Sequence, residues 1–150
     1  MSTYKKILVS VDLTDEATEV LAAANEIRQE QDADLHILTV IRPISYAYGG
    51  YDTPAIVKVM ANFESEANQM ALTKLNALCK PHKIPTDNVH VVFGRPADKI
   101  KSEAEELGVD LVVLGTHGKH GLGLLLGSTA NGVLHGAPCD VLTVRVQTQD

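Results

Sequence analysis

The sequence predicts an α/β fold, a doubly wound parallel sheet of five strands with helices on both faces. Five short runs of apolar and β-branched residues alternate along the chain with segments in which apolar residues recur every three or four positions. Strands separated by helices run parallel, since a right-handed crossover returns the chain in the same direction. The run from Asp110 to Leu114 is apolar without alternation, which is typical of a strand buried on both faces.

Each expected strand is a β-rich run that stops at or near a charged residue, a glycine or a proline. The first ends at Asp12, the second shortly before Pro43, the third at Gly94 and the fourth at Gly115. The fifth lies close to the C-terminus and is expected at an edge of the sheet. The expected strands are Lys6–Val11, Leu35–Ile41, Val89–Phe93, Asp110–Leu114 and Asp140–Val146.

Four helices are expected between or beside these strands. Thr14 is expected to cap the first, and Asp15 and Glu16 in its first turn suit the positive end of the helix dipole. Pro96 opens the third helix and Gly108 ends it. The helices are expected to extend from Thr14 to about Asp32, from Pro54 to Lys80, from Ala97 to Leu107 and from Ser128 to His135.

The second expected helix carries an apolar stripe formed by Met60, Phe63, Ala67 and Met70. This spacing places the four side chains on one side of the helix, which indicates core packing or a dimer contact. The preceding segment, 42–53, is expected to be a loop. Its tyrosines could cover a base or anchor the loop.

The composition is that of a single globular domain spanning residues 1–150. Of the 150 residues, 45% are hydrophobic and 21% are charged, which allows a sizeable core. The formal net charge of −6 argues against nucleic-acid binding, because no basic excess is available to replace the counterions of phosphates. We find no apolar run long enough for a membrane span, no secretory segment, and no metal-ligand spacing of the two cysteines. We therefore expect a cytoplasmic protein.

The most informative segment is the glycine-rich stretch that follows the fourth strand. Glycines occur at positions 115, 118, 121, 123 and 127, and Ser128 follows as the expected cap of the last helix. Glycine lets backbone N–H groups approach a ligand, and a helix start adds further unpaired N–H groups. In doubly wound sheets, ligands bind where the strand order reverses. A reversal between the first and fourth strands places Asp12 beside Gly115 and favours a phosphate site there.

Four segments, in this order, resemble the universal stress protein family over nearly the whole chain. They are KILVSVD at 6–12, DLVVLGTHG at 110–118, LLLGS at 124–128 and APCDVLTVR at 137–145. The resemblance implies a Rossmann-like fold of the adenine nucleotide α-hydrolase-like kind, a cleft for an adenine nucleotide, and homodimerisation through the last strand.

The resemblance also bears on nucleotide binding. Members that bind ATP carry Gly, two residues, Gly, nine residues, then Gly followed by Ser or Thr. Gly115 and Gly118 match the first pair and Gly127–Ser128 match the last, but only eight residues, 119–126, lie between them. The missing residue would displace Gly127 by up to about 3.5 Å. Because two extra glycines in the loop allow it to recover the geometry, we favour nucleotide binding.

The resemblance assigns the site residues. Asp12 would accept a hydrogen bond from a ribose hydroxyl, the backbone of Val40 would contact adenine, and Leu114 would line the base. Lys119 would neutralise phosphate charge, while His117 falls at a family-like position without an assigned role. The residues expected around the phosphates are Gly115, Gly118, Gly127, Ser128 and Thr129.

Several of these residues also have a structural interpretation. Asp12 could hold the turn after the first strand, and Ser128 is expected to cap a helix in either case. His117 and His120 show neither a nucleophile–acid arrangement nor the spacing of a metal pair, which favours ordinary loop histidines. Arg95 could reach a phosphate or remain a solvated charge.

The sequence leaves three functions open. The favoured one is an ATP-binding, dimeric sensor or regulator of the stress response, in which Mg²⁺ could accompany the triphosphate and ADP or AMP could replace ATP. The second is a nucleotide-free dimer that acts through protein contacts. The third is a slow nucleotide hydrolase. Since the sequence shows no general base and no Walker-type lysine motif, we expect a binding protein rather than an enzyme.

The homodimer is expected to form through the last strand, Asp140 to Val146. This strand is apolar and β-rich, and an uncovered edge strand pairs readily with another chain. Only Asp140 and Arg145 are available to protect it by charge. A lysine at Val141 or Val144 is therefore expected to give monomers.

Overall fold

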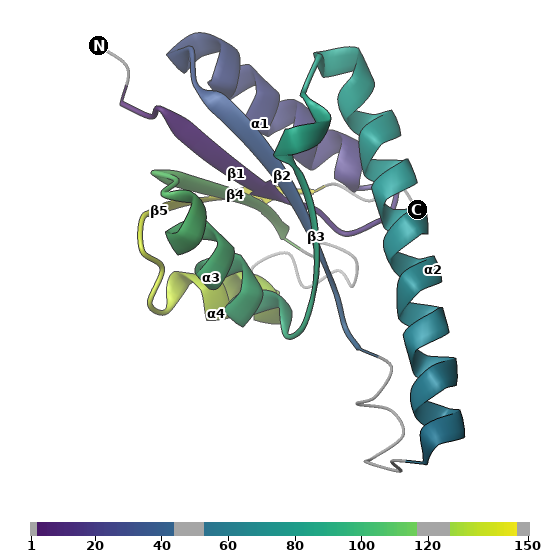
Figure 1. Ribbon diagram of the computed structural model, residues 1–150. Coiled ribbons are helices and arrows are strands. Elements are labelled where there is room, and N and C mark those ends of the chain that lie inside the picture. Colours follow the sequence, from purple (N-terminus) through teal and green to yellow (C-terminus); the bar gives the residue numbers. More distant parts are fainter. Residues whose placement is uncertain (1–2, 44–52, 117–126, 147–150) are drawn as a thin grey trace.

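The structure, a computed structural model, describes residues 3–43, 53–116 and 127–146. Five strands form one parallel sheet in the spatial order β3-β2-β1-β4-β5, so the order reverses between β1 and β4. This is the doubly wound sheet that the sequence predicts, with the last strand at an edge (Figure 1). The strands are β1 (Lys6–Ser10), β2 (Asp34–Ile41), β3 (Val89–Phe93), β4 (Leu111–Thr116) and β5 (Asp140–Arg145).

Helices cover both faces of the sheet. Side chains of α1 and of the C-terminal part of α2 pack on one face, and side chains of α3 and α4 pack on the other (Figure 1). Within the described ranges, no helix is long and apolar enough to cross a membrane. The elements are α1 (Ala17–Gln31), α2 (Pro54–Cys79), α3 (Pro96–Leu107), α4 (Ser128–Leu134), and two short 3₁₀ turns absent from the sequence prediction, η2 (Lys80–His82) and η3 (Thr86–Asn88).

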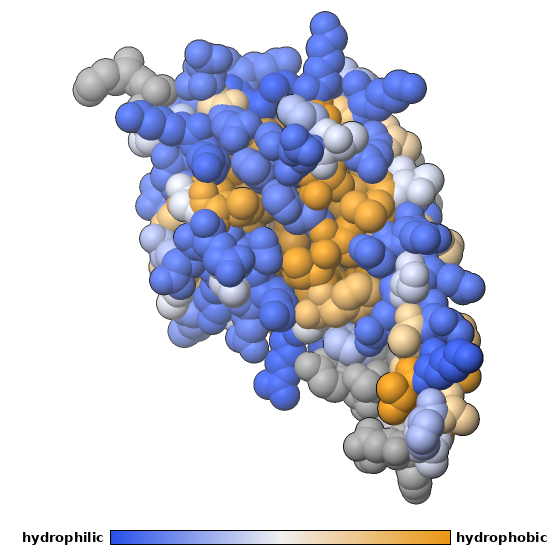
Figure 2. Space-filling view, in the orientation of Figure 1, coloured by the Kyte–Doolittle hydropathy of each residue, from blue (hydrophilic) through white to orange (hydrophobic). Residues whose placement is uncertain are grey.

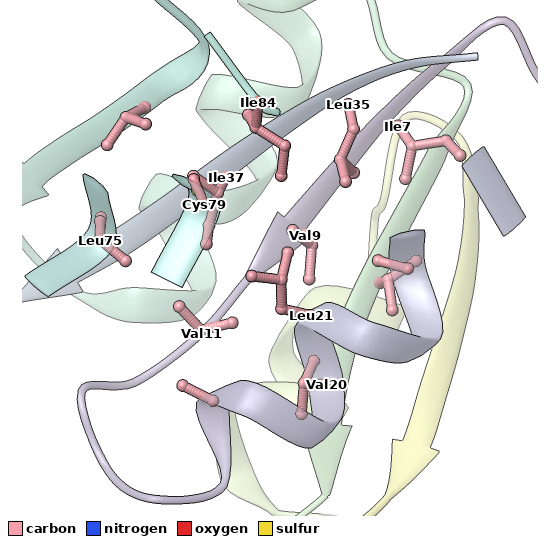
Figure 3. Close-up of a cluster of buried hydrophobic side chains, with 14 of the residues drawn as sticks. Ile7, Val9, Val11, Val20, Leu21, Leu35, Ile37, Leu75, Cys79 and Ile84 are labelled. Atoms are coloured by element: carbon pink, nitrogen blue, oxygen red, sulfur yellow. The ribbon is translucent and has the colours of Figure 1, made fainter. Parts of the chain in front are cut away.

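The core consists of two apolar layers, one on each side of the sheet. Ile7 and Val9 of β1 pack with α1 and α2, whereas Leu8 between them packs with α3 and α4, because successive side chains of a strand point to opposite faces. All three are fully buried, and Figure 3 shows the first layer with Ile7 and Val9 in it. Burial of such side chains stabilises the fold by about 1.5–3 kcal/mol each. It also fixes the central strands, and with them the site at their carboxyl ends.

Helix α1 begins at Ala17, later than the sequence predicts. Thr14 is not its cap: the Thr14 hydroxyl donates to Oδ1 of Asp12 at 2.6 Å, and the Thr14 carbonyl accepts from the N–H of Ala17 at 3.1 Å. Glu16 occupies the N-cap position without a side-chain capping bond. The carboxylate at the end of β1 competes for the Thr14 hydroxyl, so the intervening residues form a turn.

The apolar stripe of α2 is not part of the core, so the core interpretation is wrong. Phe63 is 53% exposed and Met70 is 61% exposed, whereas the buried residues of α2 are Ala71, Leu75 and Cys79. The N-terminal half of α2 extends beyond the sheet (Figure 1), and Figure 2 shows apolar surface along it. A helical repeat indicates that one side of a helix is apolar, but not that another element covers it. The dimer contact stays a prediction.

Polar contacts join the strands at their amino ends. The carboxylate of Asp110, directly before β4, accepts from the backbone N–H of Lys5 at 2.9 Å and of Lys6 at 3.2 Å. The Tyr4 hydroxyl donates to Oδ2 of Asp140 at 2.9 Å. Carboxylates of β4 and β5 thus hold the segment that leads into β1.

Candidate functional site

A cleft opens at the carboxyl ends of β1 and β4, where the strand order reverses. Its volume is about 290 Å³, and it is lined by Ala17 and Val20 of α1 and by Pro96 and Ile100 of α3. At such a reversal the helices that follow the two strands lie on opposite faces of the sheet, which leaves a crevice between them. The cleft therefore lies where the sequence predicts a ligand site.

The structure brings most of the predicted site residues together in this cleft. They come from the ends of β1, β2 and β4 and from the start of α4. His117, Gly118, Lys119 and the shortened glycine loop lie outside the described residues, so their roles stay predictions. Gly127 is the N-cap of α4, directly before two lining residues. The predicted residues that line the cleft are Asp12, Val40, Leu114, Gly115, Ser128 and Thr129.

Asp12 holds the turn after β1 and also lines the cleft. Its Oδ1 accepts from the hydroxyl of Thr14 at 2.6 Å and from the N–H of Thr14 at 3.4 Å. The structural interpretation of Asp12 is therefore confirmed. Both bonds use Oδ1, and within the described ranges no donor bonds to Oδ2. This oxygen is an acceptor for a hydroxyl group in the cleft.

Helix α4 begins at Ser128 with Gly127 as its N-cap, so the prediction that Ser128 caps the helix is wrong. Gly127 has the extended backbone of a cap residue, with φ −64° and ψ 159°, and it supplies no side-chain acceptor. The hydroxyl of Ser128 is therefore not the capping group, and Ser128 lines the cleft together with Thr129. Two adjacent hydroxyls can donate to an anionic ligand or accept from a polar one.

Gly115 lies within β4 rather than in a loop after it, with Val144 of β5 as its register partner. A Cβ atom at this position would lie 2.8 Å from Cγ2 of Val20 and 3.1 Å from Cγ2 of Val146. Glycine fits here because side chains of α1 and of the residue after β5 approach closely. The predicted contact of Gly115 with a phosphate stays a prediction.

The cleft also contains two charged residues that were not predicted as site residues, Arg42 and Glu16; Glu16 was expected only in the first turn of the helix. Arg42 follows Val40 by two positions, and side-chain alternation places both on the same side of the sheet. Arg42 was predicted to begin a loop, and β2 does end at Ile41; the alternation with Val40 was the available signal for its place in the cleft. Arg95, the cation that it did consider, is exposed and is not among the described residues lining the cleft.

The described lining is suited to binding. Its walls combine apolar side chains, hydroxyl groups, acceptor carboxylates and one guanidinium, a set that can hold an apolar ring and a polar or anionic group together. None of the described histidines lines the cleft. Among the described residues, no group of three or more His, Cys, Asp or Glu side chains is arranged to hold a metal ion.

The sequence matches known proteins along nearly its whole length. The model of the universal stress protein family matches residues 3–145. The universal stress protein A homolog 1 of Coxiella burnetii is 42% identical over 142 residues, which cover 94% of this chain and 96% of that relative.

Solved structures share the fold. The universal stress protein UspA from Lactobacillus plantarum superimposes with a TM-score of 0.77 at 27% identity, covering 95% of this chain and 98% of that one. A universal stress protein in complex with cAMP superimposes with a TM-score of 0.63 at 25% identity, covering 95% and 97%. From its sequence and its fold, the chain belongs to the universal stress protein family.

Proposed function

We propose that this protein binds an adenine nucleotide in the cleft between β1 and β4, and that it works as a dimeric, nucleotide-responsive regulator of a stress response rather than as an enzyme. The observation that carries the proposal is the meeting of six predicted site residues in one cleft at the strand reversal. In a doubly wound sheet this is the place where nucleotides bind.

The chemistry of the cleft supports a nucleotide as the ligand. Val40 and Leu114 offer apolar contact for a flat base, and Oδ2 of Asp12 offers an acceptor for a ribose hydroxyl. Ser128 and Arg42 supply donors for a phosphate. The related protein that was solved with cAMP gives further support, because cAMP combines these same three parts. We propose ATP as the ligand, with Mg²⁺ and with ADP or AMP as alternatives.

The test is calorimetric titration of the nucleotide-stripped protein with ATP and Mg²⁺, followed by AMP, cAMP and adenosine. We expect one ligand per chain with micromolar affinity. Asp12→Ala removes an acceptor and should weaken binding of all four ligands about tenfold. Asp15→Ala, a neighbouring acidic residue that does not line this cleft, is the matched control and should leave affinity unchanged.

Two outcomes would redirect the proposal. If no nucleotide or nucleoside binds, the protein belongs with members that work through protein contacts alone. If ATP and adenosine bind equally well, recognition is restricted to the base and the ribose. Arg42→Gln separates these parts, because it should weaken ATP much more than adenosine.

We propose that β5 joins two copies of the chain. Among the described strands, β5 pairs only with β4, and Leu142 in its middle is 38% exposed. Val141 and Val144 pack against the core of their own chain, so a lysine there would also damage the fold. Leu142→Lys is the better test: it should give monomers in sedimentation, and an unchanged dimer would place the interface elsewhere.

A further inference from the structure

A polar cluster lies far from the cleft, toward the amino ends of β2 and β3. His36 of β2 is only 8% exposed, and its Nδ1 lies 2.9 Å from Nε2 of His90 on β3. The two rings are stacked, with centroids 5.2 Å apart and planes inclined by 19°. Both residues lie on the face of the sheet that α3 and α4 cover, since His36 precedes Leu38 of that layer by two positions and His90 is the register partner of Leu38.

Asp34 fixes the orientation of the pair. Its Oδ2 lies 3.0 Å from Nε2 of His36, and its Oδ1 accepts from Nδ2 of Asn88 at 2.9 Å. The same Asn88 amide donates to the carbonyl of Leu35 at 2.9 Å. One hydrogen-bonded chain therefore runs from η3 through Asp34 and His36 to β3. It joins β3, which pairs with no other described strand than β2, to the rest of the sheet. Figure 1 shows β3 beside β2.

The proton positions follow from these contacts. An ionised Asp34 only accepts, so Nε2 of His36 carries a proton and donates to it. Nδ1 of the neutral His36 ring is then an acceptor, and Nε2 of His90 must carry the proton that the two rings share. One extra proton on His36 can be accommodated, because its Nδ1 then donates to a His90 that has moved its own proton to Nδ1. A second extra proton leaves two N–H groups facing each other at a separation of 2.9 Å.

We propose that the histidine pair, His36 with His90, is a proton-sensitive contact that holds β3 to β2 at neutral pH and releases it when both rings become protonated. Protonation of both rings removes the shared hydrogen bond and replaces it with repulsion between two like charges, which releases β3. Among the described strands only β2 pairs with β3, so the effect falls on this edge of the sheet and on the buried Val89 at the start of β3.

The charged residues near the histidine pair come from four elements. β2 contributes Asp34; β1 contributes Lys6, the register partner of Asp34, whose Nζ donates to the carbonyl of Leu107. η3 contributes the exposed Asp87. The charged residues along α3, the helix over this face, are Asp98, Lys99, Lys101, Glu103, Glu105 and Glu106.

Burial lowers the pKa of His90 from the ordinary 6.5, and the charge of His36 lowers it further. The pKa of His90 is therefore lower in the folded than in the unfolded protein. The stabilisation that the neutral His90 ring provides is fully present above about pH 6.5 and is lost as the pH falls through the folded-state pKa. The direction agrees with release in mild acid.

The first test compares urea unfolding at pH 7.5 and pH 5.5. The wild-type midpoint should fall on acidification by roughly 0.5 M more than that of His90→Gln, whose amide can still donate to His36 but cannot take up a proton. His135→Gln removes an exposed histidine of similar chemistry and should retain the wild-type pH dependence. Equal pH dependence of the wild type and His90→Gln would overturn the proposal.

A second measurement needs no variant. Histidine ¹⁵N spectra of the wild type at pH 7.5 should show Nε2–H rings at both positions. On acidification, amide hydrogen exchange should increase in β3, after correction for the intrinsic rate, while β4 stays protected. Rings with Nδ1–H at both positions at pH 7.5, or equal exchange changes in β3 and β4, would overturn the proposal.

Discussion

The two ends of the sheet use the same kinds of residue in different ways. At the amino ends, Asp110, Asp140 and Asp34 each bind a donor from a neighbouring segment. At the carboxyl ends, Asp12 binds only the turn that follows it, and Arg42 and Glu16 form no ion pair within the described ranges. Carboxylates at one end join strands, and charged groups at the other remain available to a ligand. The position of a residue relative to strand direction therefore decides its role.

The largest expected effect is on the stability of Asp110→Ala. This variant leaves the backbone N–H groups of Lys5 and Lys6 without their acceptor, which should cost about 1–3 kcal/mol in the free energy of unfolding. Asp12→Ala should cost about 0.5 kcal/mol, because it removes only contacts within an exposed turn. Urea unfolding at pH 7.5 measures both, and equal losses would remove the distinction between the two ends.

A smaller loss is expected for Asn88→Ala. Its amide donates to Asp34 and to the carbonyl of Leu35, and removal of both bonds should cost about 1 kcal/mol. The matched control is Asn62→Ala, on an exposed position of α2, where the unfolding midpoint should stay the same or rise slightly. If both variants behave alike, the two hydrogen bonds of Asn88 contribute nothing to stability.

The smallest effect concerns the thiol beside the amino end of β5. Burial raises the pKa of Cys139, and the charges of Asp140 and Asp110 raise it further. Asp140→Asn should therefore increase the thiolate fraction and speed alkylation of Cys139 at pH 8 by roughly two- to fivefold. Cys79 serves as the internal reference, because burial raises its pKa to about 11 and no acidic residue contributes. Mass spectrometry can follow both thiols. An unchanged alkylation rate at Cys139 would show that the charge of Asp140 does not raise the pKa of this thiol.

The reversal between the first and fourth strands, the edge position of the last strand and the meeting of Asp12 with Gly115 could be predicted from the alternation of elements in a doubly wound sheet. The helix starts could not. At both α1 and α4 a hydroxyl residue stands at the expected cap, but a carboxylate binds one and a preceding glycine takes the position of the other. Such competition depends on neighbours within a few ångströms, which a propensity does not describe.

Side-chain contacts between neighbouring strands could not be predicted from the sequence for another reason. His36 and His90 are 54 residues apart, and only the register of β2 against β3 makes them neighbours. Arg42 was missed because it follows the end of β2, where the pattern predicts a loop but not which loop side chains enter the cleft. The exposure of Phe63 was missed because the repeat of a helix says nothing about where its axis leaves the body of the protein.

The contact between α3 and α4 determines how the cleft can move. A Cβ atom on Gly132 of α4 would lie only 2.6 Å from Cβ of Ala97 on α3, so the two helices meet almost backbone to backbone. Pro96 and Thr129, which line the cleft, are attached to these same helices. Close-packed helices shift as one block rather than separately. The wall formed by α3 and α4 is therefore expected to act as one unit, so that any change in the width of the cleft displaces both helices together relative to α1.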